Sequence, residues 1–181
     1  MDKIIKYEHI GGKWMNIIKN SKQKFIFANR NLFGGFLFGL GLVAFIDETV
    51  FHQLLHWHHF YDKSTTDIGL VSDGLFHAFS WFATIFSAFM FADLRRRNAF
   101  WLARWWGGIL LGAGGFNLYD GIIQHKFMRI HQIRYNVEIL PYDLVWNLVA
   151  VALIIVGVIL VFRTRKQLSQ GEEILSGSQS H

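Results

Sequence analysis

The stretch Asp47-Glu48-Thr49-Val50-Phe51-His52-Gln53-Leu54-Leu55-His56-Trp57-His58-His59 ends a long apolar run that begins near Leu32. It places two carboxylates and four histidines at the end of a hydrophobic segment. An ionisable side chain at the centre of a bilayer costs about 2.5–3.5 kcal/mol. Such groups persist where a metal ion, a proton pathway or a buried ion pair compensates for that cost. The stretch therefore predicts a functional site in a membrane-embedded fold.

The composition is that of an integral membrane protein. Of 181 residues, 52% are hydrophobic and 17% are charged, and the mean hydropathy is +0.26. Cys is absent, which excludes disulfides, thiolate metal sites and iron–sulfur clusters. The net charge of +5 does not indicate a nucleic-acid partner, because the basic residues gather beside the hydrophobic segments.

Four apolar segments have about the length that a bilayer requires: residues 32–55, 74–92, 101–123 and 144–162. We therefore expect an all-α membrane protein, a four-helix bundle over residues 31–166. The basic N-terminal segment, 1–30, contains apolar pairs that predict a short helix on the membrane surface. The polar tail, 167–181, is predicted to be flexible.

Lysine and arginine residues indicate how the spans are oriented. Fourteen of them lie in the N-terminal segment, in the connection 95–104 and after the fourth span, whereas four lie in the other two connections. Basic residues are retained on the cytoplasmic side. Both termini are therefore predicted in the cytoplasm, and the histidine-rich ends of the spans face outward.

The chain contains an internal repeat. A shift of 73 positions lays the first span on the third, with eight identities in 25 positions, and a shift of 70 lays the second on the fourth. The identities include Gly35-x-x-x-Gly39 with Gly108-x-x-x-Gly112, patterns that let helices approach closely in lipid. We predict two helix hairpins, 32–93 and 101–163, related by a pseudo-two-fold axis along the membrane normal. The first and third spans are expected to cross at this pseudo-axis.

The ionisable residues of the two copies predict a metal site. The duplicated pairs of the second and fourth spans are Asp73 with Asp143 and His77 with Asn147. Imidazoles and carboxylates without thiolates suit Zn or Cu(II), and also Fe, rather than Cu(I). Our main hypothesis is a pseudo-symmetric site built from His52, His77 and His125, with carboxylates as ligands or as partners that hold the ligands. The full candidate set is His52, His77, His125, Asp47, Asp120, His58, His131, Asp73, His56 and Glu48.

Helical spacing constrains how these residues can meet. One helical face carries four ionisable groups at offsets of four, four and three: Glu48, His52, His56 and His59. Asp47 and His58 are eleven residues apart, about three turns, and the same holds for Asp120 and His131. If the helices continue that far, neither aspartate can touch its own histidine.

Structural roles compete with ligation at several positions. Asp73 and Asp143 stand near the starts of their predicted spans, where a helix cap or first-turn carboxylate is equally expected. The residues 56–59 also suit a polar, aromatic belt at the membrane interface. The deeper, duplicated Asp and His residues favour function over a purely structural polar network. Arg104 is expected to extend to the cytoplasmic surface.

The motifs Asp47-x4-His52-x4-Trp57-His58-His59, Asp73-Gly-Leu-Phe-His77 and Asp120-Gly-Ile-Ile-x-His125 resemble those of small bacterial four-span membrane proteins of unknown function. The resemblance covers residues 30–165. The family pattern has Gly after the first Asp and Gln before the Trp, whereas Glu48 and His56 stand here. The resemblance implies the topology and a multi-pass protein of the bacterial inner membrane, and it implies no activity.

Four functions fit these observations. The first is a metal-binding membrane protein with a site at the outer, periplasmic end, in metal handling or in maturation of a respiratory metalloenzyme. The second is a membrane metalloenzyme that activates water or oxygen, with Asp47, Glu48 or Asp120 as the general base. The others are a b-type haem protein and a proton or ion transporter. The lipid bilayer is the expected partner, and a homodimer or a respiratory-complex partner is left open.

The histidine boxes of membrane desaturases and hydroxylases give little support to the enzyme. Only His52-x-x-x-His56 fits an H-x-x-x-H box, and it lies at the end predicted to face outward, whereas those enzymes carry their boxes on the cytoplasmic side.

Overall fold

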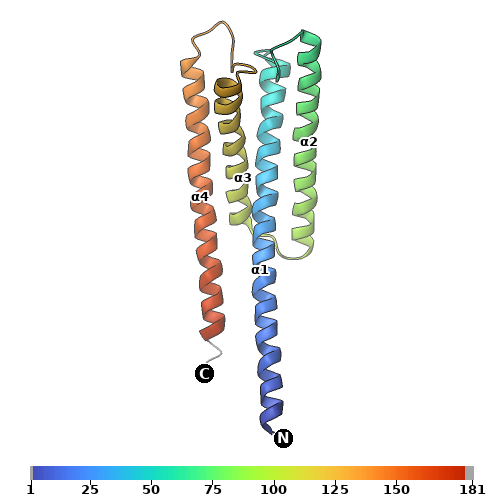
Figure 1. The fold of residues 1–181 in the computed structure, drawn as a ribbon, viewed down its shortest axis with the longest axis vertical. Helices are drawn as coiled ribbons and strands as arrows, with labels where there is room; N and C mark the ends of the chain where they lie inside the picture. Colours follow the sequence, from blue (N-terminus) through green and yellow to red (C-terminus); the bar gives the residue numbers. More distant parts are fainter. Residues whose placement is uncertain (1, 178–181) are drawn as a thin grey trace.

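Four helices stand side by side as a bundle in the computed structural model, which describes residues 2–177 (Figure 1). They are α1 (Asp2–Asp47), α2 (Thr66–Arg96), α3 (Leu102–Leu118) and α4 (Leu140–Gly177). Two π-helical segments extend the central pair: η1 (Glu48–Leu54) follows α1, and η2 (Tyr119–Met128) follows α3. Side chains are described for residues 22–170. The chain is therefore all-α, as predicted.

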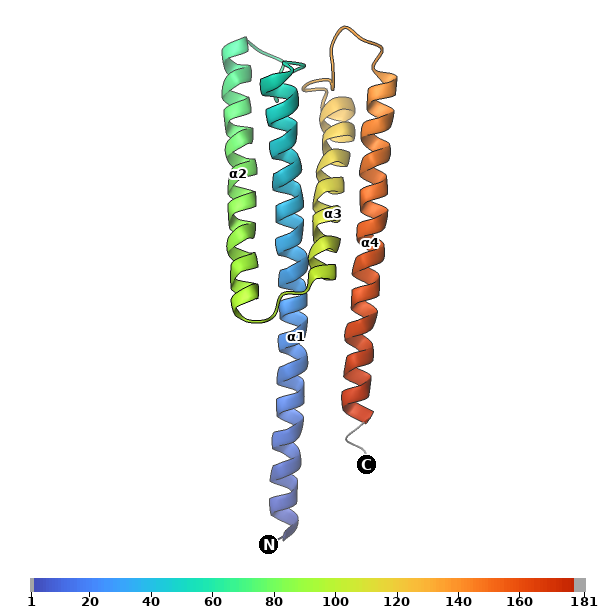
Figure 2. The ribbon, with the colours of Figure 1, turned by 180° about the vertical axis from the view of Figure 1, so that it is seen from behind.

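The helices α1 and α3 form the centre of the arrangement. Helix α2 lies against α1 and helix α4 lies against α3 (Figures 1 and 2). Three described segments are long and apolar enough to cross a membrane: Lys22–Leu54, Thr66–Arg96 and Leu140–Gln170. Helix α3 has 17 residues and is continued by η2. That the α3 segment also spans the membrane stays a prediction.

The central helices touch backbone to backbone at the paired glycines. A Cβ atom at Gly39 would lie 2.0 Å from the carbonyl oxygen of Ile109, and one at Gly112 would lie 2.0 Å from that of Phe36. Gly35 and Gly108 are equally tight, at 2.1 and 2.2 Å from backbone oxygens of the facing helix. Any side chain would separate the helices. The close approach of the first and third spans predicted at these glycines is confirmed, whereas the pseudo-axis stays a prediction.

Helix boundaries differ from the predicted spans at both ends of the chain. Helix α1 continues through the basic segment back to Asp2, and helix α4 runs past residue 167 to Gly177. Helix α2 begins at Thr66, eight residues before the predicted second span, because Thr65 caps it by accepting a hydrogen bond from the Ile68 N–H at 3.4 Å. Residues 178–181 of the predicted flexible tail lie outside the described residues.

The expectation that Arg104 extends to the surface is wrong. Its side chain is buried where α1, α3 and α4 meet. The guanidinium donates to the Ala28 carbonyl oxygen at 2.9 Å, to Thr164 Oγ1 at 3.1 Å and to Asn29 Oδ1 at 3.4 Å. These acceptors replace water, so the cation remains inside the bundle.

Both chain termini lie at one end of the bundle (Figure 1). The π-helical segments and the two loops 55–65 and 129–139 lie at the other end. This second end carries the conspicuous acidic and histidine residues of the sequence.

Candidate metal centre

Both central helices end in the same way beside their aspartates. The helix gives way to a π-helical turn next to Asp47 and again next to Asp120. The chain then reverses through a residue with left-handed backbone geometry, His56 with φ 49° and Arg129 with φ 53°. Each loop folds back over the end of its own helix. This reversal brings distant residues of the motif together.

The fold-back creates two triads with identical spacing in the sequence. Asp47, His52 and His58 form the first, and Asp120, His125 and His131 form the second. Each residue offers one ligand atom, and within a triad these atoms lie within 4.8 Å of one another. The expectation that each aspartate stays away from its histidine eleven residues later applied only to a continuous helix. Its condition of a continuous helix is not met.

The ligand atoms of the triads are spaced as a metal ion requires. Asp120 Oδ2 lies 3.1 Å from His125 Nε2, and Asp120 Oδ1 lies 3.3 Å from His131 Nε2. In the first triad, Asp47 Oδ2 lies 3.8 Å from His52 Nε2. An ion held at about 2.0–2.2 Å by nitrogen and oxygen ligands sets those ligands roughly 3–4 Å apart. Both triads could hold a metal ion.

His58 and His131 join the two triads. Their rings stack with centroids 4.6 Å apart and planes at 5°. His58 Nδ1 lies 3.0 Å from the Ile133 carbonyl oxygen, and His131 Nδ1 lies 2.8 Å from that of Phe60. Because a carbonyl can only accept, each Nδ1 carries the hydrogen, and each Nε2 presents its lone pair. Each loop thus orients the imidazole of the other loop.

Four histidine Nε2 atoms are buried in this cluster without a hydrogen bond in the described part of the chain. They belong to His52, His58, His125 and His131. His58 lies in the loop between η1 and α2. Burial lowers its pKa to about 2, with the imidazoles of His131 and His52 acting in the same direction. His58 is therefore a neutral imidazole, the form that binds metal.

Asp73 holds the first triad in place from helix α2. One carboxylate oxygen lies 3.0 Å from His52 Nδ1 and 2.7 Å from the backbone N–H of Phe60, and the other lies 2.7 Å from His59 Nδ1. Asp73 is fully buried and stands two turns inside α2. The alternative that Asp73 caps its helix is wrong, because the helix begins earlier, at Thr66.

Asp143 has the corresponding position beside the second triad. It stands in the first turn of α4, with Oδ1 at 4.0 Å from His125 Nδ1 and Oδ2 in an ion pair with Lys126. The first-turn placement was one of the two expected roles. Lys126 was not anticipated as part of the site, although its place directly after His125 was a usable signal.

Glu48 adds a third carboxylate to the first half. Its Oε1 accepts a hydrogen bond from Gln53 at 2.8 Å, and its Oε2 lies 2.8 Å from His52 Nδ1. His52 Nδ1 carries a single hydrogen, so it can donate to only one of the two carboxylates. The hydrogen-bond geometry shows that it donates to Asp73. Oε2 of Glu48 is therefore buried without a hydrogen bond. Glu48, His52 and Asp73 form a third group that could hold a metal ion.

Two predicted ligands, His77 and His56, lie apart from the triads, as does His59 of the same predicted helical face as His56. His77 belongs to none of the three groups found in the described residues, and its ring lies 5.2 Å from that of Phe45. His56 is exposed at the left-handed turn. His59 is partly buried and contacts the site through Asp73.

Comparison with known proteins assigns the chain to a family. The family model described as "Predicted membrane protein (DUF2243)" matches residues 34–164, well over half of the chain. The match includes both triads, Glu48, Asp73 and Asp143. No curated protein and no solved structure matches the chain. The chain is therefore a multi-pass membrane protein of the DUF2243 family, whose function is unknown, with buried His/Asp clusters that could bind metal.

Proposed function

We propose that this chain is a transition-metal-binding membrane protein that holds one or two ions in the two triads. The observation that carries the proposal is the set of four buried Nε2 atoms that make no well-formed hydrogen bond among the described residues, two of which lie only against Asp120 oxygens, at 3.1 and 3.3 Å. A buried polar atom left unpaired costs about 1–3 kcal/mol, and four in one cluster require a compensating partner. A cation bound between these lone pairs and the aspartates is the partner that suits all of them.

The charge of the cluster supports a divalent ion. Five carboxylates are buried there: Asp47, Glu48, Asp73, Asp120 and Asp143. Lys126 is the one lysine or arginine that pairs with them in the described part of the chain. The carboxylates outnumber this lysine five to one, so the cluster attracts cations, and protons or bound divalent ions can balance its charge. Buried charges of one sign are costly unless they are paired or coordinate a metal.

The donor set favours zinc or copper, with iron as the next choice. Imidazole and carboxylate ligands suit all three metals, and the sequence has no thiolate. The stacked rings of His58 and His131, 4.6 Å apart, leave no room for a porphyrin between them. Their direct contact makes the b-type haem alternative less favourable than a metal ion.

We also propose that the centre faces away from the cytoplasm. The distribution of lysine and arginine, fourteen to four, supports cytoplasmic termini. The termini and the metal centre lie at opposite ends of the bundle (Figure 1). A centre on the outer face of a bacterial inner membrane suits metal handling or the maturation of a respiratory metalloenzyme.

A membrane metalloenzyme is the second candidate, and Glu48 favours it. Its Oε2 is buried, makes no hydrogen bond in the described part of the chain and lies beside the first triad. A carboxylate in that position could accept a proton from a metal-bound water. The metal content of Glu48→Gln distinguishes a general base from a metal ligand. A base is not required for binding, so the variant should retain its metal if Glu48 is a base and lose it if Glu48 is a ligand.

Metal analysis of detergent-purified protein tests the proposal. The wild type should carry or take up about one or two equivalents of Zn, Cu or Fe, and His58→Ala/His131→Ala should lose most of it. His77→Ala is the matched control, because His77 is a histidine of the same bundle outside the triads. A wild type that takes up none of the three metals would contradict the proposal. So would equal metal content in all variants.

A further inference from the structure

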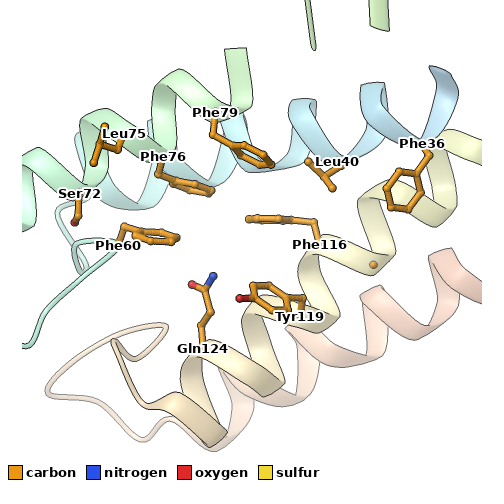
Figure 3. A pocket seen from close by; sticks show the side chains of 11 residues that line it. Phe36, Leu40, Phe60, Ser72, Leu75, Phe76, Phe79, Phe116, Tyr119 and Gln124 are labelled. Atoms are coloured by element: carbon orange, nitrogen blue, oxygen red, sulfur yellow. The ribbon is translucent and has the colours of Figure 1, made fainter. Parts of the chain in front are cut away.

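A cavity of about 570 Å³ lies between α1, α2 and α3, beside the metal centre (Figure 3). Phe60, Phe76 and Phe116 form one aromatic wall, with ring centroids 4.8 and 5.8 Å apart in succession. Phe36, Leu40 and Phe79 continue the apolar lining. Cavities of this size with a few polar groups are typical binding sites for small molecules.

Exposed apolar side chains of helix α2 line the open side, or mouth, of the cavity. Leu75 and Phe79 line the cavity and are 70% and 52% exposed. Both belong to the apolar segment Thr66–Arg96, which is long enough to cross a membrane. A molecule therefore reaches this mouth from the hydrocarbon of the bilayer, and an aliphatic chain is the chemistry available there.

The inner end of the cavity carries one buried polar group with an unmet hydrogen-bonding need. The carboxamide of Gln124 points into the cavity (Figure 3). Gln124 is 4% exposed, and its Oε1 has no hydrogen-bond partner within the described part of the chain. An amide oxygen buried in this way lacks a donor. A ligand that supplies an O–H group would satisfy it.

This polar end adjoins the metal centre. Gln124 precedes His125 in the chain, and the Phe60 carbonyl oxygen accepts from His131 Nδ1. The Phe76 ring lies 5.8 Å from the His52 ring. The neighbouring buried carboxylates repel an anionic head group, which rules out carboxylate and phosphate heads.

We propose that this cavity binds a single-chain amphiphile, with its aliphatic chain along the phenylalanines and its hydroxyl head on Gln124. The site presents the head group to the edge of the His/Asp cluster. The proposal goes beyond metal binding, and it does not require that a metal be bound.

Photolabelling of the full-length protein in detergent micelles tests the proposal. The probe is a hexadecanol analogue with a diazirine in the chain and a terminal alkyne, and labelled peptides are mapped by mass spectrometry. Label should concentrate on the cavity segments of α2 and α3. A probe with a methyl ether in place of the hydroxyl should label them about threefold to tenfold less, because it cannot donate to Gln124.

Two variants close the cavity by different routes. Gly115 lines it, and a Cβ there would lie 4.0 Å from Phe36 Cε2, an ordinary contact. Gly115→Phe should lower labelling at least about tenfold by filling the space. Gly74→Phe is the matched control, because a Cβ at Gly74 meets nothing within 4 Å and the residue does not line the cavity. Leu75→Trp narrows the exposed mouth of the cavity. It replaces Gly115→Phe as the test variant if Gly115→Phe does not fold.

The distribution of the label distinguishes binding in the cavity from nonspecific labelling by the micelle. Label confined to the cavity, lost in Gly115→Phe or Leu75→Trp and retained in Gly74→Phe, supports the proposal. Label spread evenly over the exposed faces of α2 and α4, or equal labelling by the ether probe, overturns it. Metal content measured on the same samples reports separately on the triads, so failure of one proposal is distinguishable from failure of the other.

Discussion

Replacing Gly112 by alanine should force the two central helices apart. The new Cβ would lie 2.0 Å from the Phe36 carbonyl oxygen and 2.8 Å from its carbonyl carbon. Real Cβ atoms essentially never approach closer than 3.0 Å, so α1 and α3 must separate by about 1 Å or more at this point. The contact is backbone against backbone, and no side chain can rotate away.

The size of the effect follows from packing. A gap of about 0.5–1 Å forfeits a quarter to a half of the dispersion energy of each contact, and overpacking costs about 1–3 kcal/mol. Helix propensity acts in the opposite direction and favours alanine by about 1 kcal/mol. Gly74→Ala gains the same propensity without any contact within 4 Å. Because that gain is common to both variants, it cancels in the comparison. We therefore expect Gly112→Ala to be less stable than Gly74→Ala by about 1–3 kcal/mol.

Reversible unfolding in mixed micelles, followed by circular dichroism, measures this difference. The metal affinity of Gly112→Ala should fall as well, because one triad lies at the end of α1 and the other follows α3, in η2 and the loop after it. Equal stability of Gly112→Ala and Gly74→Ala would refute the close helix crossing. A uniform change in both variants would point to helix propensity alone.

Two further substitutions probe the two ends of the bundle. The two carboxylate oxygens of Asp73 hold His52 and His59, and Asp73→Asn replaces one of these oxygens with an NH2 group, which donates instead of accepting. Metal affinity, measured by chelator competition, should therefore fall about 10–100-fold. The exposed Asp67→Asn should leave affinity unchanged, and similar values for the two variants would contradict the positioning role of Asp73. Arg104→Met removes hydrogen bonds from α3 to α1 and α4 and should lower the free energy of unfolding by about 1.5–3 kcal/mol. Its metal content should match the wild type, because Arg104 lies far from the triads; parallel loss of metal would contradict that separation.

Composition and residue spacing were sufficient to predict the helical membrane fold. The glycine patterns identified the contact between α1 and α3, because only a residue without a side chain permits backbone contact there. The shift of 73 positions paired Asp47, His52 and His58 with their counterparts in the second triad. The sequence thus contained the members of both triads, although the pseudo-two-fold symmetry stays a prediction.

The geometry of the site could not be predicted from helical periodicity. His56 and Arg129 take left-handed backbone conformations that glycine usually adopts. Because neither residue is a glycine, the sequence did not indicate where the chain reverses. His58 therefore meets Asp47 across a reversal that a continuous helix forbids. The early start of α2 at Thr66 moved Asp73 from a helix end into the interior. His77, one turn beyond Asp73, then packs against Phe45 outside the triads.

X-ray absorption at the zinc K-edge tests most directly whether the four histidines hold a metal ion. The sample is detergent-purified protein loaded with one and then two equivalents of Zn(II). We predict a first shell of nitrogen and oxygen at about 2.0–2.2 Å with outer-shell scattering from imidazole rings. That scattering should weaken in His58→Ala/His131→Ala and persist in His77→Ala. A first shell of oxygen alone, without imidazole scattering, would contradict the assignment of the triads as a metal centre.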